Sequence, residues 1–184
     1  FRRFFAEGAF SQAFIPIYTD YEKTNNPDKT NDFLNAIAGT LLVFLFIFTI
    51  LVLVFAPLFI LIFAPGFYLD PFKQSISIDV LRIMFPYLAL ISLVAFAGGI
   101  QNTHQKFSIP AFTPVVFNLS LIIAAIFIAP KYDMPIYVLA WGVIVAGILQ
   151  LLIQISPLIN INRLPIPKLD LKNPGVRKFF KLIL

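Results

Sequence analysis

The sequence predicts an all-α fold, a polytopic bundle of transmembrane helices. Hydrophobic residues make up 59% of the 184 residues and charged residues 12%, whereas an ordinary soluble domain is about 25% charged. The mean hydropathy is +0.88. The apolar residues also form long uncharged blocks without amphipathic spacing, which is typical of membrane spans and not of a soluble protein with a large core.

Four uncharged blocks reach the roughly 18 to 20 residues that a helix needs to cross a bilayer. The first, Asn35–Phe67, is built almost entirely from Leu, Ile, Val and Phe around Leu41–Phe63, the residue types that insert most readily. We therefore expect transmembrane helices over residues 33–67, 83–103, 109–130 and 135–159, with a loop over Tyr68–Arg82 between the first two.

Prolines inside or near the start of these spans are expected to kink a helix or to mark its first turn, namely Pro57, Pro86 and Pro114. Lipid tolerates such breaks only where neighbouring helices or water satisfy the freed carbonyls. This pattern favours a packed bundle with an internal cavity over a lone membrane anchor.

The connecting loops predict the orientation of the spans. Lysines and arginines gather on the face shared by the first, third and fifth loops and the chain end, at Lys23, Lys29, Lys106, Arg163, Lys168, Lys172, Arg177, Lys178 and Lys181. The opposite face has Lys73, Arg82 and Lys131. The positive-inside rule therefore places the first set in the cytoplasm.

The two ends of the chain carry the remaining elements. Because the chain starts at Phe1 and stops inside an apolar run, we expect a fragment of a longer protein. Residues 160–184 are expected to form a cytoplasmic loop leading into a further helix. A basic amphipathic helix lying on anionic lipid is the alternative for the final residues.

The opening stretch FRRFFAEGAFSQAFIPIY is the main candidate site. Read as a helix that ends near Pro16, it places Arg3, Glu7 and Ser11 on one face, because positions four apart align. Arg2 points away from this stripe and lacks a local partner. An unpartnered arginine near a membrane is either a cavity site for an anionic ligand or an anchor reaching to cytoplasmic lipid headgroups.

Other polar residues suggest packing roles. His104 is expected in a solvated turn, with a proton relay as the alternative. Asp79 and Arg82 are spaced to pair at i, i+3. Interhelical hydrogen bonds are expected from Asn118, Ser120 and Gln150. Close helix packing is expected at Gly98, Gly99, Gly142 and Gly147, with a hinge as the alternative.

Several functions are excluded by what the sequence lacks. It has no cysteine and one histidine, and we find no phosphate-binding loop, zinc motif or nucleophile elbow. We therefore expect no enzyme, no cofactor and no metal site. The net charge of +5 is attributed to membrane orientation, so nucleic acid is not an expected partner.

The opening motif resembles the signature of the MurJ (MviN) lipid II flippases. Further resemblance lies in APGF at Ala64–Phe67, FPYLALISL at Phe85–Leu93, QNTHQKFSIPAFTPVVFN at Gln101–Asn118 and LAWGVIVAGILQLLIQ at Leu139–Gln154. The resemblance covers nearly the whole chain.

This resemblance implies a fold and a function. The chain would supply most of the amino-terminal lobe of a fourteen-helix exporter-superfamily fold, with residues 1–20 as the end of a cavity-lining helix. It implies a multi-pass protein of the bacterial inner membrane that moves undecaprenyl-pyrophosphate-linked peptidoglycan precursor outward by alternating access. Arg2, Arg3 and Glu7 match the family's substrate-binding positions, and a coupling ion would bind outside this fragment.

Two other functions remain open from the residues. One is an exporter of another lipid-linked oligosaccharide in the same superfamily. The other is a non-transporting membrane scaffold whose charges anchor it. Lipid II and membrane lipids are the partners that the first reading implies.

Overall fold

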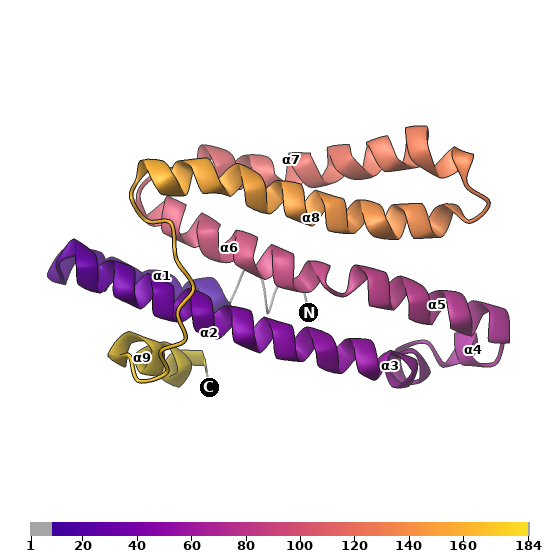
Figure 1. Ribbon diagram of the computed structural model, residues 1–184, viewed down its shortest axis with the longest axis horizontal. Helices are drawn as coiled ribbons and strands as arrows, with labels where there is room; N and C mark the ends of the chain where they lie inside the picture. Colours follow the sequence, from indigo (N-terminus) through magenta and orange to yellow (C-terminus); the bar gives the residue numbers. More distant parts are fainter. Residues whose placement is uncertain (1–8, 184) are drawn as a thin grey trace. The chain divides into compact units, whose positions relative to one another are not determined.

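The computed structural model describes residues 9–183, and every regular element in that range is a helix (Figure 1). Four helical segments within it are long and apolar enough to cross a membrane, namely Pro27–Val54, Pro71–Thr103, Ser108–Lys131 and Pro135–Asn160. The all-α class and the multi-span character that the sequence predicts are therefore confirmed.

The first helix, α1, spans Ala9–Thr24 and continues through Pro16. The expectation that this helix ends near Pro16 is wrong. Proline removes only one backbone hydrogen bond, and the following turn is held by tertiary packing, because Phe14, Ile17 and Tyr18 are almost completely buried. The helix therefore extends two turns beyond the proline.

The expected single span over residues 33–67 is divided into three helices. The first, α2, spans Pro27–Val54, and α3 (Ala56–Phe63) and α4 (Pro65–Tyr68) follow it. Both breaks coincide with proline at the start of the next helix, Pro57 in α3 and Pro65 in α4. Proline has no backbone N–H donor, but the first turn of a helix does not use that donor in its hydrogen bonds.

The expected loop over Tyr68–Arg82 is wrong, because α5 occupies Pro71–Met84. The side chain of Asp70 caps this helix by accepting hydrogen bonds from the backbone N–H groups of Phe72 and Lys73, at 3.1 and 3.3 Å. A capping aspartate followed by proline is a strong helix start. The next helix, α6, spans Tyr87–Thr103, after a break at Pro86.

The remaining helices lie within a residue or two of the expected ranges. The seventh, α7, spans Ser108–Ile123 and continues as a π-helical turn at Ala124–Ile128 and a 3₁₀ turn at Ala129–Lys131. The eighth, α8, spans Pro135–Asn160. After an extended segment of residues 161–173, which we call the linker, α9 spans Pro174–Ile183.

Contacts group these elements into two compact units, which we describe separately. Unit 1 contains residues 9–44, 91–113 and 150–183 of the described range, and unit 2 contains residues 45–90 and 114–149. The core of unit 1 is aromatic. Phe14 stacks on Tyr18 at 5.4 Å between ring centroids and meets the edge of Phe96 at 5.1 Å.

Small residues allow this close packing. A methyl group added at Gly99 would lie 3.4 Å from the ring of Phe14, so α6 and α1 approach each other at a position without a side chain. In unit 2, a Cβ at Gly147 would come within 2.8 Å of the ring of Tyr87, and one at Gly142 within 3.1 Å of the Cβ of Ala124. The packing role expected for these three glycines is confirmed.

The linker of unit 1 is fixed on α2. Asn35 of α2 accepts two hydrogen bonds from linker backbone N–H groups: its side-chain Oδ1 from Ile166 at 2.7 Å, and its backbone carbonyl from Lys168 at 3.0 Å. One turn later, a Cβ at Gly39 would overlap the carbonyl group of Lys168. The linker is therefore docked in a notch of α2 formed by Asn35 and Gly39.

Two polar expectations in unit 2 are wrong. Instead of pairing with Asp79, the Arg82 Nε donates to the backbone carbonyl of Leu53 at 3.2 Å, and Asp79 accepts from the Tyr137 hydroxyl at 3.1 Å. The Ser120 hydroxyl donates to the Val116 carbonyl of its own helix at 2.8 Å. Serine in an apolar helix satisfies itself locally in this way.

Candidate functional site

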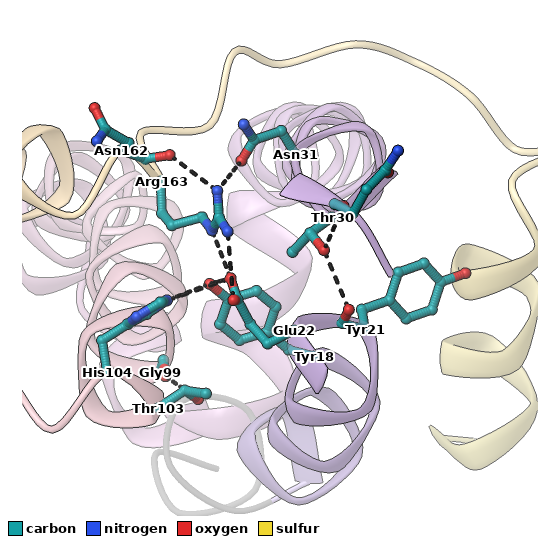
Figure 2. A network of polar contacts seen from close by, with 11 residues as sticks. Tyr18, Tyr21, Glu22, Thr30, Asn31, Gly99, Thr103, His104, Asn162 and Arg163 are labelled. Carbon is teal, nitrogen blue, oxygen red and sulfur yellow. Dashed lines mark hydrogen bonds and ion pairs between the residues drawn. The ribbon is translucent and has the colours of Figure 1, made fainter. Parts of the chain in front are cut away.

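The candidate site residues Arg2, Arg3 and Glu7 lie outside the described residues. The described helix that follows them, α1, carries a second polar group at its carboxyl end, of which the sequence drew attention only to His104. We call this group the α1-end cluster; it comprises Tyr18, Glu22, Asn31, His104 and Arg163 (Figure 2).

An ion pair between Glu22 and Arg163 is the centre of this cluster. The Arg163 Nε lies 2.5 Å from Glu22 Oε1, and Nη2 lies 3.3 Å from Oε2, so the guanidinium fork binds both carboxylate oxygens. The side chain of Glu22 is only 20% exposed, and that of Arg163 is only 12% exposed. Two-point pairing of this kind is stronger and more directional than a single contact. It joins α1 to the start of the linker.

The chain path explains why Arg163 reaches Glu22. Helix α8 ends at Asn160, and Asn162 just after it has a φ of 56°, the left-handed conformation that commonly closes a helix. This turn directs the next residue, Arg163, back over α1. Its Nη1 also donates to the Asn31 side chain at 3.2 Å and to the Asn162 carbonyl at 3.3 Å.

His104 completes the cluster from the end of α6. Its Nε2 lies 2.8 Å from the Tyr18 hydroxyl and 3.5 Å from Glu22 Oε1, while the Tyr18 hydroxyl donates to Glu22 at 3.1 Å. Gln105, at a φ of 58°, ends the helix directly after it. His104 therefore lies in the turn after α6, as the sequence predicts, but its imidazole is partnered and only 25% exposed instead of solvated.

Electrostatics keeps this carboxylate charged. Burial alone would raise the pKa of Glu22, but the hydrogen bonds and charge of Arg163, with smaller effects of Tyr18 and His104, lower the pKa below its ordinary 4.5. The same ion pair raises the pKa of Arg163. Because the folded pKa of Glu22 is depressed, its stabilising effect is complete above about pH 4.5 and is lost as the pH falls through the folded value.

The α1-end cluster predicts a measurable contribution to stability. We expect Glu22→Ala to lower the free energy of unfolding by about 1–2 kcal/mol, the range for a charged hydrogen bond reduced for partial exposure. Thermal unfolding of the full-length protein in detergent measures this change. Asp32→Ala, which removes an exposed carboxylate nearby, is the matched control. Equal losses of unfolding free energy in Glu22→Ala and Asp32→Ala would contradict the pairing. Additive losses in the double variant of Glu22→Ala and Arg163→Ala would contradict it as well.

A second buried polar group joins α6, α7 and α8. The Gln101 Nε2 donates to Gln154 Oε1 at 2.5 Å, the Gln154 Nε2 donates to the Val94 carbonyl at 3.1 Å, and the Gln150 Nε2 donates to the Thr113 carbonyl at 3.0 Å. All three glutamines are at most 2% exposed. The interhelical role expected for Gln150 is confirmed, and Gln101 and Gln154 are additions.

These side chains hold helices of unit 1 together, although the buried Gln101 Oε1 has no hydrogen-bond partner within the described part of the chain. The Glu22 carboxylate is occupied by Arg163, and the glutamine amides bridge neighbouring helices. Among residues 9–183, no group of three or more His, Cys, Asp and Glu side chains is placed to hold a metal ion. The arrangement joins α1, α6, α7, α8 and the linker within unit 1.

The spans, proline breaks and buried interhelical polar pairs together define the class: this is a multi-pass membrane protein of the helical-bundle type. The family follows from comparison with known proteins. The model of the family described as "Lipid II flippase MurJ" matches residues 1–184, and the chain belongs to that family.

Relatives and a solved structure agree with this assignment. The chain is 42% identical over 183 residues to the "Probable lipid II flippase MurJ" of Buchnera aphidicola subsp. Baizongia pistaciae, covering 100% of this chain and 36% of the relative. It is 38% identical over 181 residues to the "Lipid II flippase MurJ" of Burkholderia cenocepacia, covering 96% and 35%.

The solved structure is titled "Lipid II flippase MurJ, inward closed conformation". It matches 99% of this chain and 37% of its own at a TM-score of 0.77 and 26% identity. The chain thus spans little more than a third of the length of the curated relatives and of the structure that it matches.

Proposed function

We propose that the protein containing this chain is a lipid II flippase of the bacterial cytoplasmic membrane. The observation that carries the proposal is the family match over all 184 residues, with relatives that are named lipid II flippases at 38–43% identity. The cargo would be the lipid-linked peptidoglycan precursor, moved from the cytoplasmic to the periplasmic leaflet by alternating access of two lobes around a cavity.

The proposed role of Arg2 and Arg3 is to bind the pyrophosphate of the cargo. A guanidinium is charged at every accessible pH, and its planar fork matches phosphate oxygens at two points. Glu7 is one helical turn from Arg3 in the sequence and would hold that arginine in position when the cavity is empty. Binding of this kind needs no covalent step, so the protein acts as a transporter and not as a catalyst.

The charge pattern supports the proposed orientation. The loop ends that carry the α1-end cluster belong to the lysine- and arginine-rich face, which the positive-inside rule assigns to the cytoplasm. A substrate made on the cytoplasmic side would then enter between the helices from that face. The polyprenyl tail would remain in the surrounding lipid while the headgroup crosses, and an ion that drives the cycle would bind in parts of the protein beyond this chain.

Depletion of the full-length protein tests the proposal. A bacterial strain in which it is the only flippase should accumulate the lipid-linked disaccharide-peptide and stop growing when expression is shut off, because export of the precursor fails. Restored expression should reverse both effects. Accumulation of a different lipid-linked sugar would identify an exporter of another oligosaccharide. Normal lipid pools and growth would favour the non-transporting scaffold.

A further inference from the structure

The net charge of the chain is concentrated at its carboxyl end. Residues 161–184 contain six lysines and arginines and one aspartate, a net charge of +5 that equals the net charge of all 184 residues. Residues 1–160 therefore contain equal numbers of cationic and anionic side chains. One of the six cations, Arg163, is neutralised by Glu22. The rest of the linker and α9 therefore carry five cations and one aspartate, a net charge of +4.

Packing fixes the apolar side of α9 inside unit 1. Val176 is 1% exposed and Phe179 is 6% exposed, and both belong to the aromatic core of this unit. The approach is close at the first turn, where a Cβ on Gly175 would overlap the ring of Phe33 and lie 2.8 Å from the Tyr21 hydroxyl oxygen. The apolar surface of α9 at these positions is therefore buried by protein and does not insert into lipid.

The opposite side of α9 and the end of the linker present their cations to the outside. Lys172, Arg177, Lys178 and Lys181 are all exposed, and we call these four residues the basic face. Lys178 also contacts the exposed Asp20 of α1 at 3.6 Å, a pair too open to cancel its charge. The linker crosses α2 before it leads into α9 (Figure 1). Because the linker is docked on Asn35 and α9 is packed on α1, the backbone that carries the basic face is held in place.

We propose that the basic face binds the headgroups of anionic phospholipids. It is carried by unit 1 beside the first turns of α2, which is a candidate membrane span, so the basic face lies at the end of a helix that would emerge at a bilayer surface. Each lysine or arginine near an anionic surface raises the binding affinity about fivefold, and this effect decays with distance over about one Debye length. A patch that is already ordered adds little entropic cost on binding.

The test uses the full-length protein in detergent and measures binding of phosphatidylglycerol by native mass spectrometry, with phosphatidylcholine as the zwitterionic reference. The test variant is Arg177→Gln/Lys178→Gln/Lys181→Gln. The matched control is Lys73→Gln/Lys106→Gln/Lys131→Gln, which removes three exposed cations outside α9, the linker and the first turns of α2. A charge-retaining variant, Arg177→Lys/Lys178→Arg/Lys181→Arg, tests whether charge or shape matters, and thermal unfolding establishes that each variant is folded.

We expect the test variant to lose about 100-fold in phosphatidylglycerol affinity at low salt, the product of three such factors. The control and the charge-retaining variant should bind as wild type does, and phosphatidylcholine binding should not change. Equal losses in the test variant and the control, or no loss in either, would overturn the proposal. Displacement of the lipid by millimolar inorganic pyrophosphate or by an RNA oligonucleotide would equally overturn it, in favour of a soluble anionic partner.

This result is independent of transport. Phosphatidylglycerol binding is measured without lipid II, so loss of the headgroup site and failure of the flippase proposal give different outcomes. The variant that loses lipid binding can still be assayed for complementation in the depletion strain.

Discussion

Replacing Arg2 or Arg3 by alanine in the full-length protein is expected to abolish growth in a strain depleted of its own flippase, with normal protein levels in the membrane. Each substitution would remove the proposed two-point contact with the pyrophosphate, and a hydrogen bond to a charged group is worth about 1.5–3 kcal/mol. Affinity for lipid II should therefore fall about 10- to 100-fold, which binding of the purified variants measures.

Lysine at the same positions should recover only part of this function. It keeps the charge but lacks the planar fork that matches two phosphate oxygens. Lys29→Ala, which removes an exposed cation from the same predicted membrane face, is the control and should grow normally. Wild-type growth of both arginine variants would assign these side chains to lipid anchoring instead of substrate binding.

Gly39→Ala is expected to have the largest effect on the fold. A single methyl group at this position would overlap the backbone of Lys168, which cannot rotate away as a side chain can. The linker would be forced off α2 and would lose both hydrogen bonds to Asn35. Two hydrogen bonds and the resulting strain correspond to about 2–3 kcal/mol of unfolding free energy.

Thermal unfolding and limited proteolysis of the linker both measure this effect. Gly66→Ala is the matched control, because a Cβ at Gly66 meets no atom within 4 Å. The alanine at position 39 should expose the linker to cleavage near Lys168, and the alanine at position 66 should not. If the two variants unfold and are cleaved alike, the linker is not docked in the Asn35–Gly39 notch in solution.

Local sequence signals were sufficient for the helical class and for most of the spans. Lipid requires long uncharged apolar segments, so α7 and α8 begin and end within a residue or two of the expected bounds, when the short turns after α7 are counted. Pro57 and Pro86 also lie at real breaks between helices. The missed helix α5 also has a local signal, the Asp70-Pro71 pair at its start. A search for long apolar blocks overlooks this helix because α5 is less apolar than the four blocks expected to span the membrane.

Long-range partners could not be inferred from local patterns. Glu22 and Arg163 are 141 residues apart, and Asn35 and Ile166 are 131 residues apart. Nothing in the residues around Gly39 shows that a backbone crosses it, and nothing around His104 shows that Tyr18 and Glu22 lie beside it. These contacts depend on which helix ends meet in space, and only the folded chain determines that.

The central claim is that Arg3 faces a water-filled cavity shaped for a diphosphate headgroup. Labelling tests it directly, because this chain has no native cysteine and a single Arg3→Cys variant of a full-length protein cleared of other cysteines can be followed. We predict that the new thiol reacts with a membrane-impermeant reagent and that added lipid II protects it. A thiol that stays inert, or one that reacts equally with and without lipid II, would contradict the claim.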